Sequence, residues 1–418
     1  MAERVLRPEG KGFLFLDSHP PGCARTVAEM VAEARESASA AETGAVGSGT
    51  EAAAGPAVLV IGCSAGYGLA TTIAGLFGQR ARTIGVCYER PPTARRSASA
   101  GWYRTVALAR EAAEAGLYFD AVNGDCFDPA VRAEVLDRAA RAIGPVDVLI
   151  YSVAAPRRTD PRTGIVHHSA VKPIGTSYTA RNVAFADGAI LRESALGPAT
   201  EAEIESTVKV MGGEDWADWI GDLAERRLLA PGFRTAALTY VGSELTAPVY
   251  RHGTIGRAKD HLEATARELT AGPLADVGGT ALTSVNCAAV TMSSLAIPGI
   301  SVYLSLLRKV AGDATESPVR QSVRLWEYLT GQPGTAIVDS VGRLRLDGWE
   351  LDRDVQAELA ARWGASSEEL LAGLADVDWF RREIWRLYGF DVAGVDYSVP
   401  VEVDWLWPQQ AAASQEAH

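Results

Sequence analysis

The stretch "VLVIGCSAGYGLATTIAGLFG", residues 58–78, joins a short apolar run to a glycine-rich turn and then to a helical run. The first four residues are uncharged and mostly β-branched, which is typical of a strand buried on both faces of a sheet. Gly62, Gly66 and Gly68 follow with the spacing G-x3-G-x-G. A strand, a glycine turn and a helix in this order predict a dinucleotide-binding unit, and a turn that binds no ligand is the alternative.

Each of the three glycines has its own predicted purpose. Gly62 permits a tight turn, Gly66 lets the backbone approach a ligand, and Gly68 lets the helix pack close to the strand. The helix expected from about Tyr67 to Phe77 directs its free N–H groups and the positive end of its dipole at the turn. This arrangement suits a diphosphate.

The composition narrows the classes of protein to which the chain can belong. Its 418 residues suit one large α/β domain with additions, or two domains, and 47% of them are hydrophobic, enough for a substantial core. A net charge of −12 argues against general binding to nucleic acid or to a membrane surface. The chain shows neither the apolar core of a signal peptide nor a run long enough for membrane insertion.

The cysteines indicate a reducing environment. They are odd in number, and none forms a CxxC pair; they are Cys23, Cys63, Cys87, Cys126 and Cys287. Free thiols are the simplest account of this pattern. We therefore expect a cytoplasmic protein, with no nucleic-acid partner.

Strands and helices alternate beyond Gly62. Five further strands are expected, at residues 81–89, 117–125, 146–154, 235–242 and 280–290. Helical runs such as residues 128–144 lie between them. This alternation predicts an α/β fold with a doubly wound, Rossmann-like parallel sheet, in which ligands bind at the carboxyl ends of the strands.

The chain is expected to divide into three parts. Residues 1–56 hold a strand, a helix over residues 24–38 and a flexible linker, "SASAAETGAVGSGTEAAAG" at residues 37–55. Residues 57–310 form the Rossmann-like core that binds the dinucleotide. Residues 311–418 form a C-terminal extension packed on this core, so that extra elements from both ends surround the substrate site.

Acidic residues follow two of the expected strands. Glu89 stands about 20 residues past the last motif glycine, where an acid binds the adenosine ribose, and its charge would favour NADH over NADPH. Arg90 weakens this preference, because an arginine can accept the 2′-phosphate of NADPH. A solvated charge is the alternative for Glu89, and capping of an N-G-D turn is the alternative for Asp125.

Tyr250 and Lys259 form the pair that carries the predicted chemistry. Nine helical steps would place them on opposite faces of one helix, so Tyr250 must precede the helix if the two cooperate. Gly253 and Gly256 make this arrangement possible. A nearby ammonium would favour the phenolate, and such a tyrosine can donate a proton or a hydrogen bond to a carbonyl oxygen. A packed loop tyrosine and a solvated lysine are the alternative.

Several long motifs resemble the FabV type of trans-2-enoyl-CoA and enoyl-ACP reductases, enlarged relatives of short-chain dehydrogenases. They include "GFLFLDSHPPGC" at 12–23, "NGDCF" at 123–127, "YSVAAPRRTDPRTG" at 151–164, "TVKVMGGEDW" at 207–216, "TYVGSELTAPVYRHGTIGRAK" at 239–259, "VTMSSLAIP" at 290–298, "DGWELDRDVQAE" at 347–358 and "YGFDVAGVDY" at 388–397. The resemblance runs through most of the chain. It implies NADH-dependent reduction of the C2–C3 double bond of an enoyl-CoA or enoyl-ACP thioester, in fatty acid biosynthesis, by a monomer or a weak dimer.

The resemblance also implies roles for individual residues. Tyr250 is the proton donor, Lys259 holds the nicotinamide ribose, and Tyr240 contacts the substrate. The residues implied for binding NADH, besides Lys259, are Gly62, Cys63, Ser64, Ala65, Gly66, Tyr67, Tyr88, Glu89, Asp125, Cys126, Val153, Ala154, Ala289, Val290 and Thr291. No metal site is implied, and we see no flavin-specific signal.

Two segments depart from the family pattern. Met292, Ser293 and Leu295 alter a segment near the acyl pocket, while Arg251 and His252 stand beside Tyr250. The first departure leaves open a reductase of enones in a specialised pathway. A dinucleotide-binding sensor without turnover is the second alternative.

Other polar residues suggest sites less strongly. His252 is expected to be a solvated loop residue, and the pair at 167–168 a surface turn. The arginines at 157–158 could meet the phosphates of a carrier or form a solvated corner. Glu214 and Asp215 are expected as helix-start charges, while Trp216 and Trp219 are expected in the core.

Overall fold

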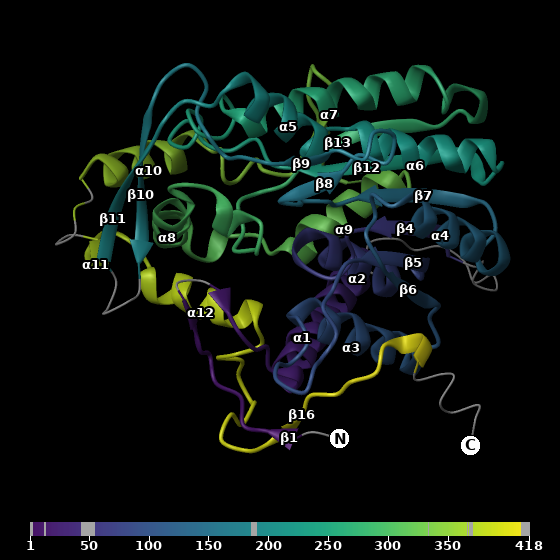
Figure 1. The fold of residues 1–418 in the computed structure, drawn as a ribbon, viewed down its shortest axis with the longest axis horizontal. Coiled ribbons are helices and arrows are strands. Elements are labelled where there is room, and N and C mark those ends of the chain that lie inside the picture. The colour runs from purple at the N-terminus through teal and green to yellow at the C-terminus, as the bar shows by residue number, and fades with distance from the viewer. Residues whose placement is uncertain are drawn as a thin grey trace.

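The structure is a computed structural model, and it describes residues 3–11, 14–42, 55–184, 190–332, 334–365, 367 and 371–410. At its centre lies an eight-stranded sheet in the order β14-β15-β13-β12-β7-β4-β5-β6 (Figure 1). Neighbouring strands are parallel, except that β14 is antiparallel to β15. The strands are β4 (Ala57–Ile61), β5 (Arg82–Cys87), β6 (Phe119–Asn123), β7 (Val146–Tyr151), β12 (Leu229–Thr239), β13 (Thr280–Val285), β14 (Ile337–Val338) and β15 (Arg343–Arg345).

The order of the strands confirms the predicted doubly wound fold. From β6 to β13 the strands run in the order third, second, first, fourth, fifth and sixth of the parallel series. The direction of winding reverses between β4 and β7, which lie side by side. Ligands bind at such a reversal, outside the carboxyl ends of the strands. The glycine turn that follows β4 therefore lies where a dinucleotide is expected.

Two layers of helices cover the sheet. On one face, Leu59 and Ile61 of β4 share a core with Trp216 and Trp219, which confirms the prediction for these tryptophans. The helices of this face are α4 (Pro129–Ala142), α6 (Glu214–Glu225) and α7 (Thr254–Ala271), and α5 (Glu201–Met211) packs against α7. On the other face lie α1 (Pro20–Glu42), α2 (Gly66–Gln79), α3 (Ala100–Glu114) and α9 (Pro318–Leu329). The strand at 58–61 is thus buried on both faces, as its sequence predicts.

Additional elements surround α8 (Ile300–Ala311) at one side of the sheet (Figure 1). They are the hairpin of β10 (Tyr178–Ala184) and β11 (Ile190–Leu196), with α10 (Arg353–Ala365), α11 (Leu371–Leu374) and α12 (Val377–Leu387). Three short pairs complete the fold: β1 (Glu3–Arg4) with β16 (Val401–Glu402), β2 (Gly10–Lys11) with β3 (Leu14–Phe15), and β8 (Arg157–Thr159) with β9 (Val166–His168). Among the described helices, none combines the length and the apolar character needed to cross a membrane.

Several boundaries differ from the sequence prediction, among them those of α1 and β13. The helix α1 continues to Glu42, so the first residues of the expected linker are helical, and residues 43–54 lie outside the described residues. The strand expected at 280–290 ends at Val285. Beyond it, the backbone N–H groups of Cys287 and Ala288 donate to the side chains of Gln321 and Glu350 rather than to a strand.

Candidate active site

The glycine turn after β4 has the geometry that its sequence predicts. Gly62 has a φ of +93°, and a Cβ on it would lie 2.1 Å from the carbonyl oxygen of Ser152. A Cβ on Gly68 would lie 1.9 Å from the carbonyl oxygen of Gly62, so only glycine lets α2 approach the strand this closely. The methyl group of Thr291 lies near Gly66. The loops after β4, β7 and β13 therefore converge at this turn.

Tyr67 ties the start of α2 to its surroundings. Its hydroxyl donates to the carbonyl oxygen of Cys287 over 2.8 Å and lies 3.2 Å from Oε1 of Gln321. Burial raises the pKa of this phenol well above its ordinary value. The side chain thus holds the loop after β13 against α2, while its predicted contact with the diphosphate stays a prediction.

Glu89 is anchored by serines rather than solvated. Its two carboxylate oxygens accept hydrogen bonds from Ser64 and Ser99, over 2.6 and 2.5 Å. A Cβ on Gly101 would lie only 2.0 Å from this carboxylate, which shows how closely the start of α3 packs against it. Tyr88, next to it, is exposed. The carboxylate is therefore fixed beside the turn, and its contact with a ribose stays a prediction.

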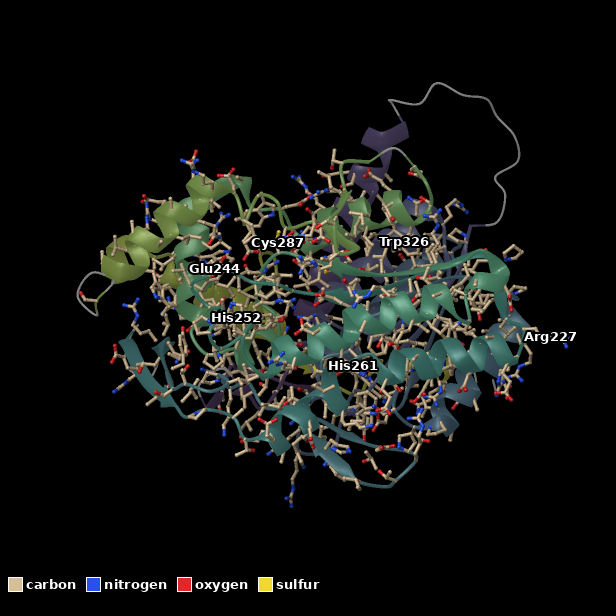
Figure 2. All side chains as sticks on the ribbon, turned by 90° about the horizontal axis from the view of Figure 1, so that it is seen from above. Arg227, Glu244, His252, His261, Cys287 and Trp326 are labelled. Carbon is tan, nitrogen blue, oxygen red and sulfur yellow. The ribbon has the colours of Figure 1, made fainter. Side chains whose placement is uncertain are left out.

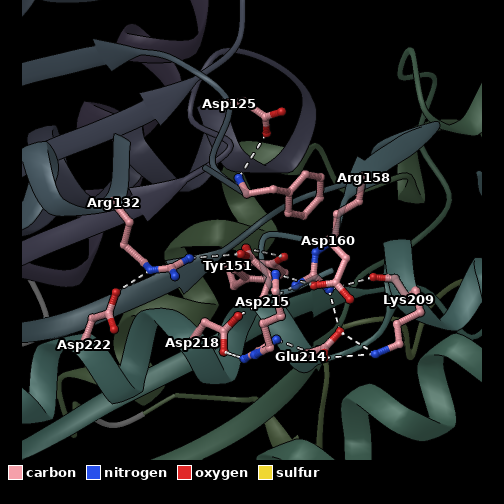
Figure 3. Close-up of polar contacts among 12 residues, drawn as sticks. Asp125, Arg132, Tyr151, Arg158, Asp160, Lys209, Glu214, Asp215, Asp218 and Asp222 are labelled. Atoms are coloured by element: carbon pink, nitrogen blue, oxygen red, sulfur yellow. Dashed lines mark hydrogen bonds and ion pairs between the residues drawn. The ribbon is translucent and has the colours of Figure 1, made fainter. Parts of the chain in front are cut away.

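The residues after β7 stand next to the turn in the sheet order, and those after β6 stand one strand further away, beyond β5. Asp125 accepts a hydrogen bond from the backbone N–H of Phe127 over 3.0 Å, which is the turn capping named as its alternative (Figure 3). Burial raises the pKa of the Cys126 thiol. Val153 is half-buried and Ala154 is exposed. No contact here tests their predicted roles toward NADH.

Tyr250 precedes α7, and Lys259 lies in the second turn of that helix, as the spacing requires for a cooperating pair. The turn is closed by hydrogen bonds from the N–H of Tyr250 to the carbonyl oxygen of Thr246 and from the N–H of Gly256 to that of Tyr250. A Cβ on Gly256 would lie 1.8 Å from the carbonyl oxygen of Arg251. The small residue therefore permits the sharp passage from turn to helix.

Burial dominates the electrostatics of this pair. Tyr250 is 6% exposed and Lys259 is 8% exposed. Burial raises the pKa of the Tyr250 hydroxyl, opposed by the charge of Arg251, and burial lowers the pKa of Lys259 to about 8, opposed by the charge of Glu263. The charge found to favour the phenolate is thus that of Arg251, and cooperation with Lys259 stays a prediction.

The polar atoms of Tyr250 and Lys259 are available to a ligand. In the described part of the chain, no residue bonds to the hydroxyl of Tyr250 or to Nζ of Lys259. Neither atom is among the described polar atoms that are both fully buried and without a hydrogen-bond partner. Both therefore remain reachable from solvent, although most of each side chain is buried.

Tyr240 has a partner that sequence reasoning missed. Its hydroxyl donates to Oε1 of Glu350 over 2.8 Å, and the hydroxyl of Tyr303 donates to the same oxygen over 2.7 Å. The rings of Tyr240 and Tyr250 meet edge to face, with centroids 5.2 Å apart. Glu350 lies in "DGWELDRDVQAE", one of the motifs that carry the resemblance. Its position between the apolar residues Trp349 and Leu351 was the signal in the sequence that could have indicated a buried acid.

A second cluster of charges is structural, and it corrects one expectation (Figure 3). Arg158 is neither solvated nor free for a phosphate, because it is buried and paired with Glu214 and Asp218. Glu214 and Asp215 stand at the start of α6, as expected, and Asp215 is buried there. It accepts a hydrogen bond from Tyr151 over 3.0 Å, and burial raises its pKa to about 7.

The described histidines form no metal site. Figure 2 labels His252 before α7, where its side chain is exposed as expected, and His261 along the helix. His167 and His168 lie on β9, not in the expected turn. Across the described residues, no group of three or more potential ligands could hold a metal ion.

Three family models match successive parts of the chain. Residues 5–94 match the NAD(P)H binding domain of trans-2-enoyl-CoA reductase, and residues 96–329 match the trans-2-enoyl-CoA reductase catalytic region. Residues 338–401 match a model described as the enoyl reductase FAD binding domain.

The helices of this last segment do not fit a flavin dinucleotide. At the start of α10 the N–H groups of Asp354 and Val355 donate to the carboxylate of Asp352, and in α12 the N–H of Trp379 donates to the carboxylate of Asp376. A carboxylate at this position repels a diphosphate, which helix starts otherwise bind. The inward faces of both helices are occupied by the apolar cluster around α8. We therefore assign flavin no part in the reaction.

Relatives and solved structures cover almost the whole chain. The enoyl-[acyl-carrier-protein] reductase [NADH] of Streptomyces avermitilis is 52% identical over 97% of this chain and 100% of its own length. The trans-2-enoyl-CoA reductase of Clostridium acetobutulicum, solved with NADH, has a TM-score of 0.88 and 33% identity over 96% of this chain and 98% of that one. The Treponema denticola enzyme, solved with NAD, has a TM-score of 0.87 and 36% identity over 97% and 99%. The chain therefore belongs to the trans-2-enoyl-CoA reductase family.

Proposed function

We propose that the chain reduces the C2–C3 double bond of a trans-2-enoyl thioester with NADH, and that Tyr250 is the proton donor. The family and its NADH-dependent reductase activity confirm the prediction from the sequence motifs. The assignment of roles to side chains is our proposal. It is supported above all by the paired burial of Tyr250 and Lys259, whose polar atoms are left without partners among the described residues.

NADH would lie over the carboxyl ends of the strands, with its diphosphate at Gly62–Gly68. The start of α2 offers free N–H groups and the positive end of a helix dipole at this place. Glu89 would meet the adenosine ribose, and Lys259 would hold the nicotinamide ribose. The bound cofactor supplies a hydride to C3 of the enoyl group.

The protein's own part is to stabilise the charge that then moves through C2 to the thioester oxygen. Tyr250 donates a hydrogen bond to this oxygen. Its raised pKa keeps the proton on the phenol until charge develops nearby. Protonation of the enolate gives the saturated acyl thioester.

NADH oxidation with a panel of thioesters tests the proposal. The panel contains crotonyl-CoA, longer enoyl-CoA and enoyl-ACP substrates, and free enones, with NADPH in parallel. Turnover of enoyl thioesters is expected, and turnover restricted to free enones would contradict it. Tyr250→Phe should lower kcat by roughly 10²–10³ and leave the affinity for NADH unchanged, as expected for loss of one donor to an oxyanion. Undiminished kcat in this variant would refute the role of Tyr250.

We also propose that one chain is sufficient for activity. The family resemblance supports this proposal, since it implies a monomer or a weak dimer. Sedimentation of the active enzyme should therefore give the mass of a monomer, and a specific activity that rises with protein concentration would contradict this.

A further inference from the structure

Glu350 is a carboxylate buried without an ion pair in the described part of the chain. It is 0% exposed, and its carboxylate accepts three hydrogen bonds. Tyr240 and Tyr303 donate to Oε1, while the backbone N–H of Ala288 donates to Oε2. Burying an unpaired charge costs several kcal/mol or more, roughly, even when hydrogen bonds compensate for part of it. A purely structural position would be filled at lower cost by a neutral side chain.

The surroundings of Glu350 favour its protonated form. The titratable groups that face it come from five different segments: Tyr67 of α2, Tyr240 after β12, Cys287 after β13, Tyr303 of α8 and Asp347 after β15. Asp347 is itself paired with Arg345. Burial therefore raises the pKa of Glu350 to about 7, although its three hydrogen bonds act to lower it.

The protonation state of Glu350 controls where the proton of Tyr240 points. An ionised carboxylate only accepts hydrogen bonds, so the Tyr240 hydroxyl must donate to it. That proton is then withheld from any substrate oxygen. A protonated Glu350 has an O–H of its own to donate to Tyr240, and the phenol proton becomes free to point elsewhere.

The position of Tyr240 connects this change to the proposed proton donor. Its ring packs edge to face on Tyr250, with centroids 5.2 Å apart. A free Tyr240 hydroxyl would thus lie close to the group that meets the thioester oxygen. The enolate that forms there needs donors, and a second donor would stabilise it further.

We propose that Glu350 is a positioning residue, and that its protonation releases the hydroxyl of Tyr240 to donate to the thioester oxygen beside Tyr250. This inference rests on the proposed function. It assigns to the C-terminal segment, which matches a flavin-domain model, a direct influence on the enoyl-reducing site. Because the added hydrogen bond strengthens as charge develops, it should affect kcat more than KM.

Glu350→Gln tests the proposal, because glutamine imitates the protonated acid: it offers a donor to Tyr240 and an acceptor to Ala288. In the unchanged enzyme, kcat at saturating NADH should fall as pH rises through about 7, toward the lower value that Tyr250 supports without Tyr240. In Glu350→Gln this decline should disappear. A wild-type pH profile in the variant would overturn the proposal.

Two further variants distinguish a specific effect of Glu350 from a general effect of misfolding. Tyr303→Phe removes a hydrogen bond that lowers the pKa of Glu350, so its midpoint should move to higher pH. An unmoved midpoint would count against the proposal. Asp215→Asn is the matched control, because it also neutralises a buried carboxylate with a pKa of about 7 that is bonded to a tyrosine. It should keep the wild-type midpoint of kcat, and a shift as large as that of Glu350→Gln would overturn the assignment.

The outcome distinguishes this proposal from the proposed function. If none of the enoyl thioesters in the panel is reduced by the unchanged enzyme, the function itself fails. If an enoyl thioester is reduced but Glu350→Gln has the same pH profile as the unchanged enzyme, only the role of Glu350 fails. Binding of NADH, followed by fluorescence, confirms in each variant that the site is folded.

Discussion

Burial shifts the pKa values of Tyr250 and Lys259 in opposite directions. The phenol gains affinity for its proton, whereas the ammonium loses affinity for its own. Both shifts follow from the cost of a charge in a site with few solvent contacts. Tyr250 therefore keeps its proton until negative charge develops on a substrate nearby. The ammonium of Lys259 can lose its proton near pH 8.

The affinity for NADH should therefore depend on pH through Lys259. Below pH 8 the ammonium is largely charged and can attract the anionic cofactor, and above it the amine becomes neutral. The Kd for NADH should rise with pH above about 8, by at most about tenfold for each pH unit. Fluorescence titrations at pH 7 and pH 9 measure this change.

Lys259→Met is the matched comparison, because it keeps the apolar stem of the side chain. This variant should bind NADH more weakly at pH 7 and show no further weakening at pH 9. The same pH dependence in both proteins would exclude Lys259 as its source.

At the scale of elements, α2 and the preceding turn depend on close contact between backbones. The carbonyl oxygen of Gly62 occupies the space of a Cβ on Gly68, at 1.9 Å. A side chain there would push the start of α2 away from the strand. The free N–H groups that are predicted to bind the diphosphate would move with it.

Gly68→Ala should therefore weaken NADH binding and lower the free energy of unfolding by about 1–3 kcal/mol, as is usual for overpacking. Gly78→Ala in the same helix is the control, because a Cβ there would meet its nearest atom, of Ala38, at 4.0 Å. It should stabilise the protein by up to about 1 kcal/mol and leave binding unchanged. Denaturant unfolding and NADH titration measure both effects, and equal behaviour of the two variants would refute the packing argument.

At the scale of the whole molecule, segments far apart in the chain meet at the edge of the sheet. Trp407 is 4% exposed, donates from Nε1 to the carbonyl oxygen of Ala121 over 3.0 Å, and contacts Trp102 with ring centroids 4.6 Å apart. The N–H of the Trp102 indole donates in turn to the carbonyl oxygen of Trp405. The segment after β16 thereby covers β6 and α3.

Trp407→Ala should lower the free energy of unfolding by about 3–5 kcal/mol, the usual cost of deleting a large buried side chain. Leu406→Ala changes the neighbouring residue, which is 48% exposed, and should alter stability by no more than about 0.5 kcal/mol. At a temperature where both variants are folded, kcat should equal that of the unchanged enzyme. A kcat loss in Trp407→Ala without loss of stability would contradict a purely structural role.

The sequence by itself determined the doubly wound sheet, the glycine turn and the place of Tyr250 before its helix. These features depend on neighbours in the chain: a β-branched run, glycines where a Cβ would clash, and a spacing incompatible with a single helix. The motifs at 239–259 and elsewhere also identified the family. Local pattern was a poor guide where a side chain from elsewhere replaced a strand partner, as at Cys287 and Ala288.

Only the tertiary structure decided which charged side chains are buried and with which residues they form hydrogen bonds or ion pairs. Arg158 was expected to meet phosphates or solvent, the burial of Asp215 was not predicted, and Glu350 had no predicted role, because the partners of each lie far away in the sequence. Burial and charge pairing depend on distances in space, and spacing along the chain does not report them. The link between Tyr240 and Glu350, separated by 110 positions, exists because the C-terminal segment folds back onto the carboxyl ends of the strands.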